Sequence, residues 1–188
     1  MHQSVASGQP VCLFSATLPR MNAMTCSTPL PVTGLYDDVA ALAKRYCDLI
    51  EACDQPGWLA EIARLLPRLL AAIMSMSVPR WGVDHSVPVD LDARFDLFAR
   101  LRHLLADRDS YWLEFDSASD GAEAMTGSLA DDLTDMYCEL KQGLCLFERD
   151  PDCAVAAWAH GYARHWGQHL IDAERHLAVL RASARLES

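Results

Sequence analysis

The sequence predicts an all-α fold, a single-domain bundle of about five helices that run mostly antiparallel. Three observations support this prediction. Apolar residues recur at helical spacing in long segments, no segment alternates with the period of a β-strand, and most connections between the segments are short. Hydrophobic residues make up 51% of the 188 residues, which is enough for one core. We expect the bundle to cover residues 34–184, after a disordered or loosely ordered tail at residues 1–33.

The first two helices are predicted on either side of a tight turn. The first covers residues 35–52, and Thr33 can cap its N-terminus. The turn has the sequence Asp-Gln-Pro-Gly at residues 54–57. The second helix covers residues 58–76 and contains Pro67, so we expect it to be kinked or divided at that residue.

A loop, a third helix and an aromatic segment are predicted next. Residues 77–89 contain two prolines and a glycine, which favour a loop. Asp90 then caps a third helix that extends to residue 107. The aromatic segment at residues 111–116 is predicted to form a turn of helix or an extended piece, and a loop leads from it to Gly127.

The last two helices have clear start signals. Ser128 opens the fourth helix with an acidic variant of the capping box, and this helix extends to residue 148. Asp150 caps the fifth helix, and Pro151 suits its first position. The apolar pattern predicts that the fifth helix is continuous to residue 182.

Charge and cysteine content narrow the classes of function. The net charge is −10, and residues 109–140 contain no Lys or Arg, so nucleic acid and anionic lipid are repelled whereas a cation or a basic partner is attracted. The alternative is a solvated acidic face. No apolar stretch approaches the roughly 20 residues that span a bilayer. Because the seven cysteines include no Cys-x-x-Cys pair, we expect reduced thiols and a cytoplasmic protein.

The last two predicted helices carry polar side chains beside their apolar stripes. At 100° per residue, one flank of the fifth helix carries Trp158, His165, His169 and His176, with Asp172 just beyond. On the fourth helix, some carboxylates lie on the flank of the apolar stripe, and others lie further around the helix surface. The candidate site residues are Asp132, Asp135, Glu139, Trp158, His165, His169 and Asp172.

A row of carboxylates facing a row of histidines suits a divalent metal, which is the candidate cofactor. His165 and His169 are four residues apart, so their rings can converge on one ion, with Asp132 as the third predicted ligand. Asp172 can orient an imidazole or ligate directly. The same pairing also suits a general base beside a carboxylate that sets its tautomer.

Two alternatives to a metal or catalytic site stay open. The rows can form a structural network that fixes the register of the two helices, or the residues can be exposed without a shared role. The two-His zinc-protease motif needs a Glu where Trp166 stands, and neither helix contains Glu-x-x-His. Gly143 and Gly167 indicate either a close approach of the two helices or a gap that admits a ligand.

Three segments resemble a bacterial family known only as domain of unknown function 5063. They are Tyr111-Trp-Leu-Glu-Phe-Asp116, the acidic helix from Ser128 to its Leu-Lys-Gln-Gly-Leu144 ending, and His165-Trp-Gly-Gln-His169. The sequence departs from the family pattern at Ala159-His160-Gly161, where bulkier residues are expected. The resemblance implies an all-helical fold and brings no assigned activity.

These observations predict a protein-interaction or small-ligand-binding module, with a protein partner or a second copy of the chain as the expected partner. The lack of a complete catalytic motif favours a non-enzymatic role. The alternative is a metal-dependent hydrolase of a phosphorylated small molecule, because Leu-Ala-Asp-Asp-Leu-Thr-Asp at residues 129–135 is similar to the acidic helix of all-α nucleotide pyrophosphatases. Those enzymes also use an earlier Glu-Glu-x-x-Glu helix, which the first predicted helix lacks.

Overall fold

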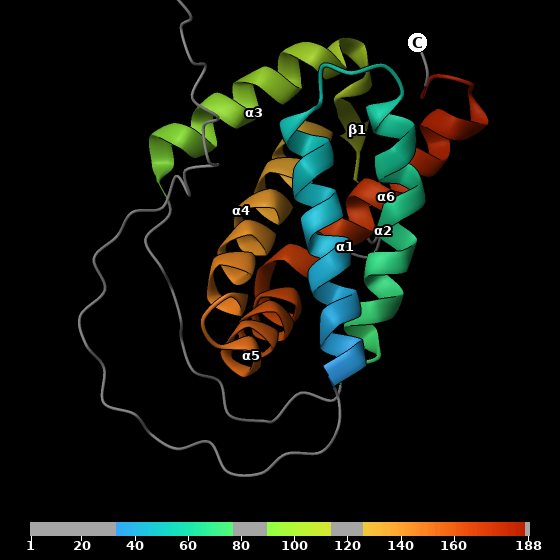
Figure 1. The fold of residues 1–188 in the computed structure, drawn as a ribbon. Helices are drawn as coiled ribbons and strands as arrows, with labels where there is room; N and C mark the ends of the chain where they lie inside the picture. The colour runs from blue at the N-terminus through green and yellow to red at the C-terminus, as the bar shows by residue number, and fades with distance from the viewer. Residues whose placement is uncertain (1–32, 77–89, 114–125, 187–188) are drawn as a thin grey trace, which may run out of the picture. The chain divides into compact units, whose positions relative to one another are not determined.

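The computed structural model describes residues 33–76, 90–113 and 126–186 of the chain. Predictions for residues 1–32, 77–89 and 114–125 therefore lie outside the described residues. The helices are α1 (Thr33–Glu51), α2 (Trp58–Met74), α3 (Leu91–Leu105), α4 (Leu129–Phe147), α5 (Pro151–Gly161) and α6 (Gly167–Ala182) (Figure 1). The shorter elements are η1 (Ala106–Arg108), β1 (Ser110–Trp112), β2 (Thr126–Ser128) and η2 (Tyr162–Trp166).

Helix α4 lies at the centre of the packing, because it contacts α1, α3, α5 and α6. Helix α2 contacts α1 and α6. In Figure 1, α1 and α2 run antiparallel, as do α4 and α5, and α3 crosses them obliquely. Every one of these helices contributes buried side chains to one hydrophobic cluster. The prediction of an all-α, single-domain fold is confirmed.

Three predicted helix caps are present. Asp90 accepts hydrogen bonds of 3.1 Å from two backbone N–H groups in the first turn of α3. Ser128 Oγ accepts one of 3.3 Å from the first turn of α4, and Asp150 accepts one of 3.1 Å from that of α5. Each side chain satisfies an N–H group that has no partner inside its own helix.

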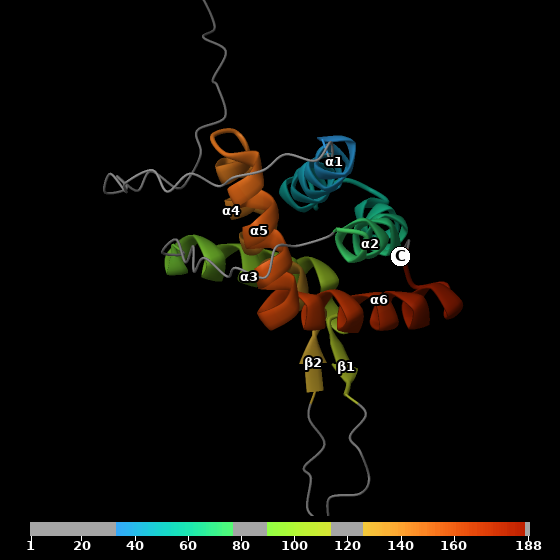
Figure 2. The ribbon, with the colours of Figure 1, turned by 90° about the horizontal axis from the view of Figure 1, so that it is seen from below.

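The fifth predicted helix is not continuous, and this prediction was wrong. It is divided into α5 and α6 by η2, a π-helical turn in which the Gly167 N–H reaches the Tyr162 carbonyl five residues earlier. A Cβ on Gly167 would collide with that carbonyl, so the close approach requires glycine. Figure 2 shows α5 and α6 running in clearly different directions. Counted as one bent rod, the two give the predicted total of five helices among the described residues.

The aromatic segment after α3 is extended rather than helical over its described part. Tyr111 pairs with Gly127 at the centre of an antiparallel pair formed by β1 and β2, and this pairing was not predicted. The phenol ring lies against Gly127, where a Cβ would overlap it. Tyr111 is therefore fixed between the strand pair and α4.

Pro67 does not divide α2, which continues through it. Proline has no N–H, so the carbonyl of Ala63, four residues earlier, loses its helical partner. Arg181 of α6 supplies the missing donor, because its Nη2 lies 3.1 Å from the Ala63 oxygen. A tertiary contact thus compensates for the proline.

Arg181→Met should lower the free energy of unfolding by about 1 kcal/mol, because it leaves the Ala63 carbonyl without a donor. In a Pro67→Ala background the new N–H at position 67 restores the helical bond, so the cost of Arg181→Met should fall. Urea unfolding of the double-mutant cycle measures this coupling. Arg68→Met, at an exposed position on α2, is the control. An equal cost of Arg181→Met in both backgrounds would contradict the assignment.

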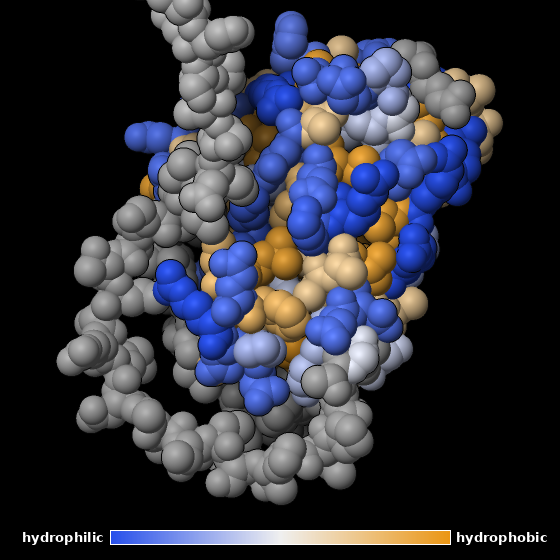
Figure 3. Space-filling model, viewed as in Figure 1, coloured by the Kyte–Doolittle hydropathy of each residue, from blue (hydrophilic) through white to orange (hydrophobic). Residues whose placement is uncertain are grey.

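On the face seen in Figure 3, polar side chains separate small apolar areas of the surface from one another. None of the helices in the described ranges has the length and apolar character needed to cross a membrane. Cys47 and Cys138 are buried, and burial raises the pKa of the Cys47 thiol to about 12. Cys145 is only half-buried.

Candidate functional site

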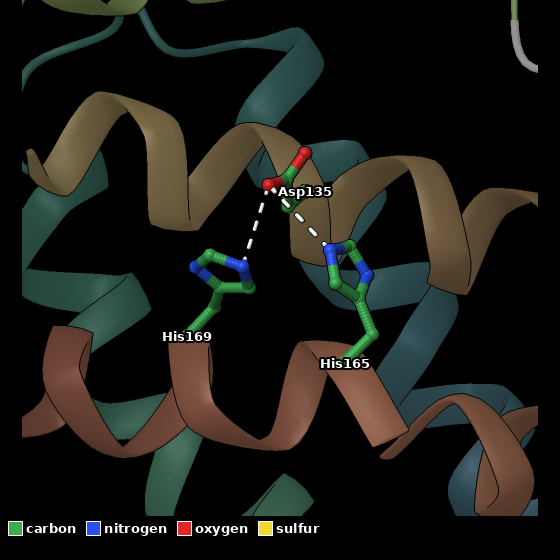
Figure 4. A group of neighbouring side chains, drawn as sticks. All are labelled: Asp135, His165 and His169. Carbon is green, nitrogen blue, oxygen red and sulfur yellow. Dashed lines mark ion pairs between the residues drawn. The ribbon is translucent and has the colours of Figure 1, made fainter. Parts of the chain in front are cut away.

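The polar side chains of α4 face those of the bent rod formed by α5, η2 and α6, which we call the C-terminal rod. We call this group the Asp–His seam and define it as Asp132, Asp135 and Glu139 of α4, His165 of η2 and His169 of α6. Helices α4 and α6 pack together, and η2 also contacts α4. Figure 4 shows both imidazole rings pointing from the C-terminal rod toward Asp135.

His169 lies between two carboxylates. Its Nδ1 is 2.8 Å from Oδ1 of Asp132, and its Nε2 is 3.4 Å from Oδ2 of Asp135. Because an ionised carboxylate only accepts hydrogen bonds, the shorter contact places a proton on Nδ1. The remaining nitrogen, Nε2, faces Asp135.

His165 repeats this arrangement with one different carboxylate. Its Nδ1 is 3.2 Å from Oε1 of Glu139, and its Nε2 is 3.9 Å from Oδ2 of Asp135. The two imidazole centroids are 5.1 Å apart, with the rings nearly perpendicular. Asp135 Oδ2 is therefore shared by the Nε2 atoms of both histidines.

Three ligand-type atoms converge in this way, from Asp135, His165 and His169, and all lie within 4.8 Å of one another. Zinc bonds to nitrogen and oxygen at about 2.0–2.2 Å, so neighbouring ligands of a tetrahedral ion are about 3.3 Å apart. The contacts of 3.4 and 3.9 Å to Asp135 Oδ2 are close to this spacing. The donor set of two imidazoles and one carboxylate suits zinc or iron.

Arg94 of α3 holds the other oxygen of Asp135. Its Nε donates to Asp135 Oδ1 at 2.8 Å, and its Nη2 donates to Asp131 Oδ1 at 3.1 Å. This leaves Oδ2 facing the histidines. Sequence reasoning missed Arg94. The one available signal was the pair Asp131 and Asp135, whose i,i+4 spacing lets a single guanidinium bridge both carboxylates. No local pattern identifies which arginine forms this bridge.

Tyr111 of β1 holds the outer side of Asp132. Its hydroxyl donates to Asp132 Oδ2 at 2.5 Å, and its ring stacks on His176 with centroids 4.7 Å apart. His176 in turn bonds the Arg108 carbonyl through Nε2 at 2.7 Å, so it lies outside the seam. Sequence reasoning missed this role of Tyr111, because the role depends on the unpredicted pairing of β1 with β2.

Burial and hydrogen bonding shift the pKa values in the seam. Burial raises the pKa of Asp132, and the hydrogen bonds from His169 and Tyr111 oppose that shift. The hydrogen bond to Asp132 raises the pKa of His169 above its ordinary value, although burial of the ring acts in the other direction. His169 therefore holds its second proton more tightly than a free imidazole does.

Five of the seven predicted site residues come together in the seam, and two do not. Trp158 is 1% exposed, and its indole N–H donates to the Leu140 carbonyl at 3.3 Å. Asp172 accepts a hydrogen bond of 3.0 Å from Gln168 and is not part of the convergent group. Asp132, predicted as the third metal ligand, bonds Nδ1 of His169 instead, and Asp135 occupies the converging position.

The space over the two helical glycines is filled rather than open. The indole of Trp158 lies against Gly143, and the backbone and ring of Tyr162 lie against Gly167. A ligand-sized gap is therefore absent at both glycines. The neighbour of Gly143 is a side chain of α5, whereas the neighbour of Gly167 belongs to the preceding turn η2 rather than to α4.

Comparisons with known proteins agree with this architecture. The fold is similar to the crystal structure of protein BF1032 from Bacteroides fragilis, with a TM-score of 0.64 and 19% identity over 77% of this chain and 90% of that one. At this identity the likeness concerns the fold alone. No curated protein matches the chain. A family model described as a domain of unknown function, DUF5063, matches residues 32–183. The chain therefore belongs to the DUF5063 family, which is uncharacterised.

Proposed function

We propose that this chain is a small-ligand-binding helical protein whose ligand is a divalent metal ion, bound by Asp135, His165 and His169. One observation carries the proposal: both histidines direct Nε2 at the same oxygen, Asp135 Oδ2, while both Nδ1 atoms contact other carboxylates. A metal-bound histidine usually gives its second nitrogen to a carboxylate or carbonyl, because that bond fixes the tautomer and the ring orientation. Asp132 and Glu139 have this supporting role.

Charge around the group also supports cation binding. The seam brings together three carboxylates, while Arg94 bonds Asp135 only through Oδ1. A structural network is the competing explanation, in which protonated imidazoles simply pair with the carboxylates. The two explanations differ in one measurable property, since only the first predicts stoichiometric and site-specific metal uptake.

Metal-free, tag-free protein should bind one zinc ion in calorimetry and give the visible absorption of a nitrogen- and oxygen-ligated Co²⁺ site. His165→Ala, His169→Ala and Asp135→Asn should each lower the affinity by more than about 100-fold, beyond the 10–100-fold typical of supporting residues. His103→Ala is the matched control, since His103 is exposed on α3. The titration is run at pH 7.5, because protons compete with the metal for Nε2 and the pKa of His169 is raised.

No uptake at pH 7.5, or uptake that falls equally in the His103→Ala and His169→Ala variants, would contradict the proposal. In that case the seam is a structural network. The predicted protein partner or second copy is tested separately, by light scattering of the same preparation.

A metal-dependent hydrolase of a phosphorylated small molecule is the second candidate function. Its support is the accessibility of the seam: the His165 side chain is 51% exposed, and three protein ligands leave a coordination position for water. Metal-loaded protein screened against nucleotides and sugar phosphates tests it, with the His169→Ala variant as the blank. We also infer a cytoplasmic location, supported by the free thiols of Cys47, Cys53 and Cys138.

A further inference from the structure

A second polar feature lies away from the seam, between α2 and α6. These helices are in contact and cross each other (Figure 2), and a cavity of about 220 Å³ is lined by residues of both. Its apolar lining includes Leu66, Pro67 and Leu177, and its charged lining is Glu174 and Arg181. The cavity is smaller than the roughly 300–1,000 Å³ of sites for drug-sized ligands, so a smaller metabolite fits it.

Glu174, which lines this cavity, also carries an unsatisfied polar atom. Its Oε1 is buried without a hydrogen-bond partner, and it is the one such side-chain atom among the described residues. Burial raises the pKa of this carboxyl. A buried polar atom without a partner is unusual in a folded protein. Because Oε1 is closed off from the cavity, Oε2 is the oxygen of this carboxylate that a ligand can reach.

The two charges at the cavity do not neutralise each other. Glu174 and Arg181 both line it, yet neither forms an ion pair with the other or with any further group in the described part of the chain. Arg181 uses one guanidinium nitrogen for the Ala63 carbonyl. It also lines a neighbouring cavity of about 430 Å³, whose other charged residue is Arg64, the ion-pair partner of Glu61. The lining of the cavity between α2 and α6 therefore carries a negative charge at Glu174 and a positive charge at Arg181.

We propose that the cavity between α2 and α6 binds a small zwitterion with an apolar body, namely an aliphatic amino acid. Glu174 accepts hydrogen bonds from its ammonium group, Arg181 donates to its carboxylate, and the side chain lies on Leu66, Pro67 and Leu177. This site shares no residue with the Asp–His seam, so the two can be tested independently.

Three probes with one carbon skeleton test the charge requirement. L-leucine carries both charged groups, 3-methylbutylamine lacks the carboxylate, and 4-methylpentanoate lacks the ammonium group. In a ¹⁵N–¹H NMR titration of the full chain, L-leucine should shift amide signals of α2 and α6 with a dissociation constant below about 1 mM. Each analogue should bind at least about tenfold more weakly, because it loses one charged hydrogen-bonding group.

Glu174→Gln should weaken L-leucine binding at least about tenfold. This variant should also fold, because it removes an ionised carboxylate whose oxygen has no partner. Glu148→Gln, at an exposed position after α4, is the matched control and should bind normally. Equal binding of the three probes, normal binding by Glu174→Gln, or no L-leucine-dependent shifts at all would overturn the proposal.

Discussion

Gly143→Ala is expected to lower the free energy of unfolding by about 2–3 kcal/mol. A Cβ at this position would overlap the indole of Trp158, which is 1% exposed and bonds the Leu140 carbonyl at 3.3 Å. The ring cannot move aside without losing this bond and its packing against Phe147. The free-energy cost of this overlap exceeds the roughly 1 kcal/mol by which alanine is more favourable than glycine inside a helix.

Urea unfolding measures this effect, and two further variants isolate its cause. Gly34→Ala in α1 is the matched control, because Gly34 is exposed and a Cβ there would meet no atom within 4 Å. In a Trp158→Leu background the smaller side chain makes room, so the cost of Gly143→Ala should largely disappear. A Gly143→Ala protein as stable as the wild type would show that Trp158 does not occupy this space.

Asp132→Ala is expected to cost about 3 kcal/mol, an effect of similar size. Asp132 is 5% exposed and accepts hydrogen bonds from the Tyr111 hydroxyl at 2.5 Å and from His169 Nδ1 at 2.8 Å. The substitution leaves both donors at a buried position without their acceptor. Tyr111→Phe removes one of these bonds and should cost about 1 kcal/mol.

Asp131→Ala is the matched control in the adjacent residue. The Asp131 side chain is 45% exposed, and its contact with Arg94 is worth at most about 1 kcal/mol. If His169 binds a metal, Asp132→Ala should also weaken zinc binding by about 10–100-fold, whereas Asp131→Ala should not. Equal stability losses at the two positions would mean that Asp132 has no special part in the seam.

Local signals explain why much of the fold was predictable. The caps at Asp90, Ser128 and Asp150 act on N–H groups two or three residues away, so sequence alone identifies them. The pairing of β1 with β2 joins residues 110–112 to residues 126–128 and has no comparable local pattern. The π-helical turn changes the helical spacing by a single residue, too little to disturb an apolar pattern that is read over many turns.

The seam was predictable in its residue types but not in its pairing. Helical spacing alone puts His165 beside His169 and puts Asp132 and Asp135 on one helix. Which carboxylate meets Nε2 and which meets Nδ1 depends on the rotation of α4 against α6, and that rotation is decided by packing. Arg94 and Tyr111 come from other elements, so no pattern within the two helices could reveal them.

The π-helical turn makes the seam sensitive to insertion and deletion. Adding or removing one helical residue rotates everything after it by about 100°. A deletion between residues 161 and 167 would therefore turn His169 away from Asp132, even if every remaining side chain were kept. Substitutions in the same stretch leave that rotation intact where the side chain fits. In related chains that keep both histidines in the seam, the number of residues in the π-helical turn should therefore vary less than the amino-acid types found there.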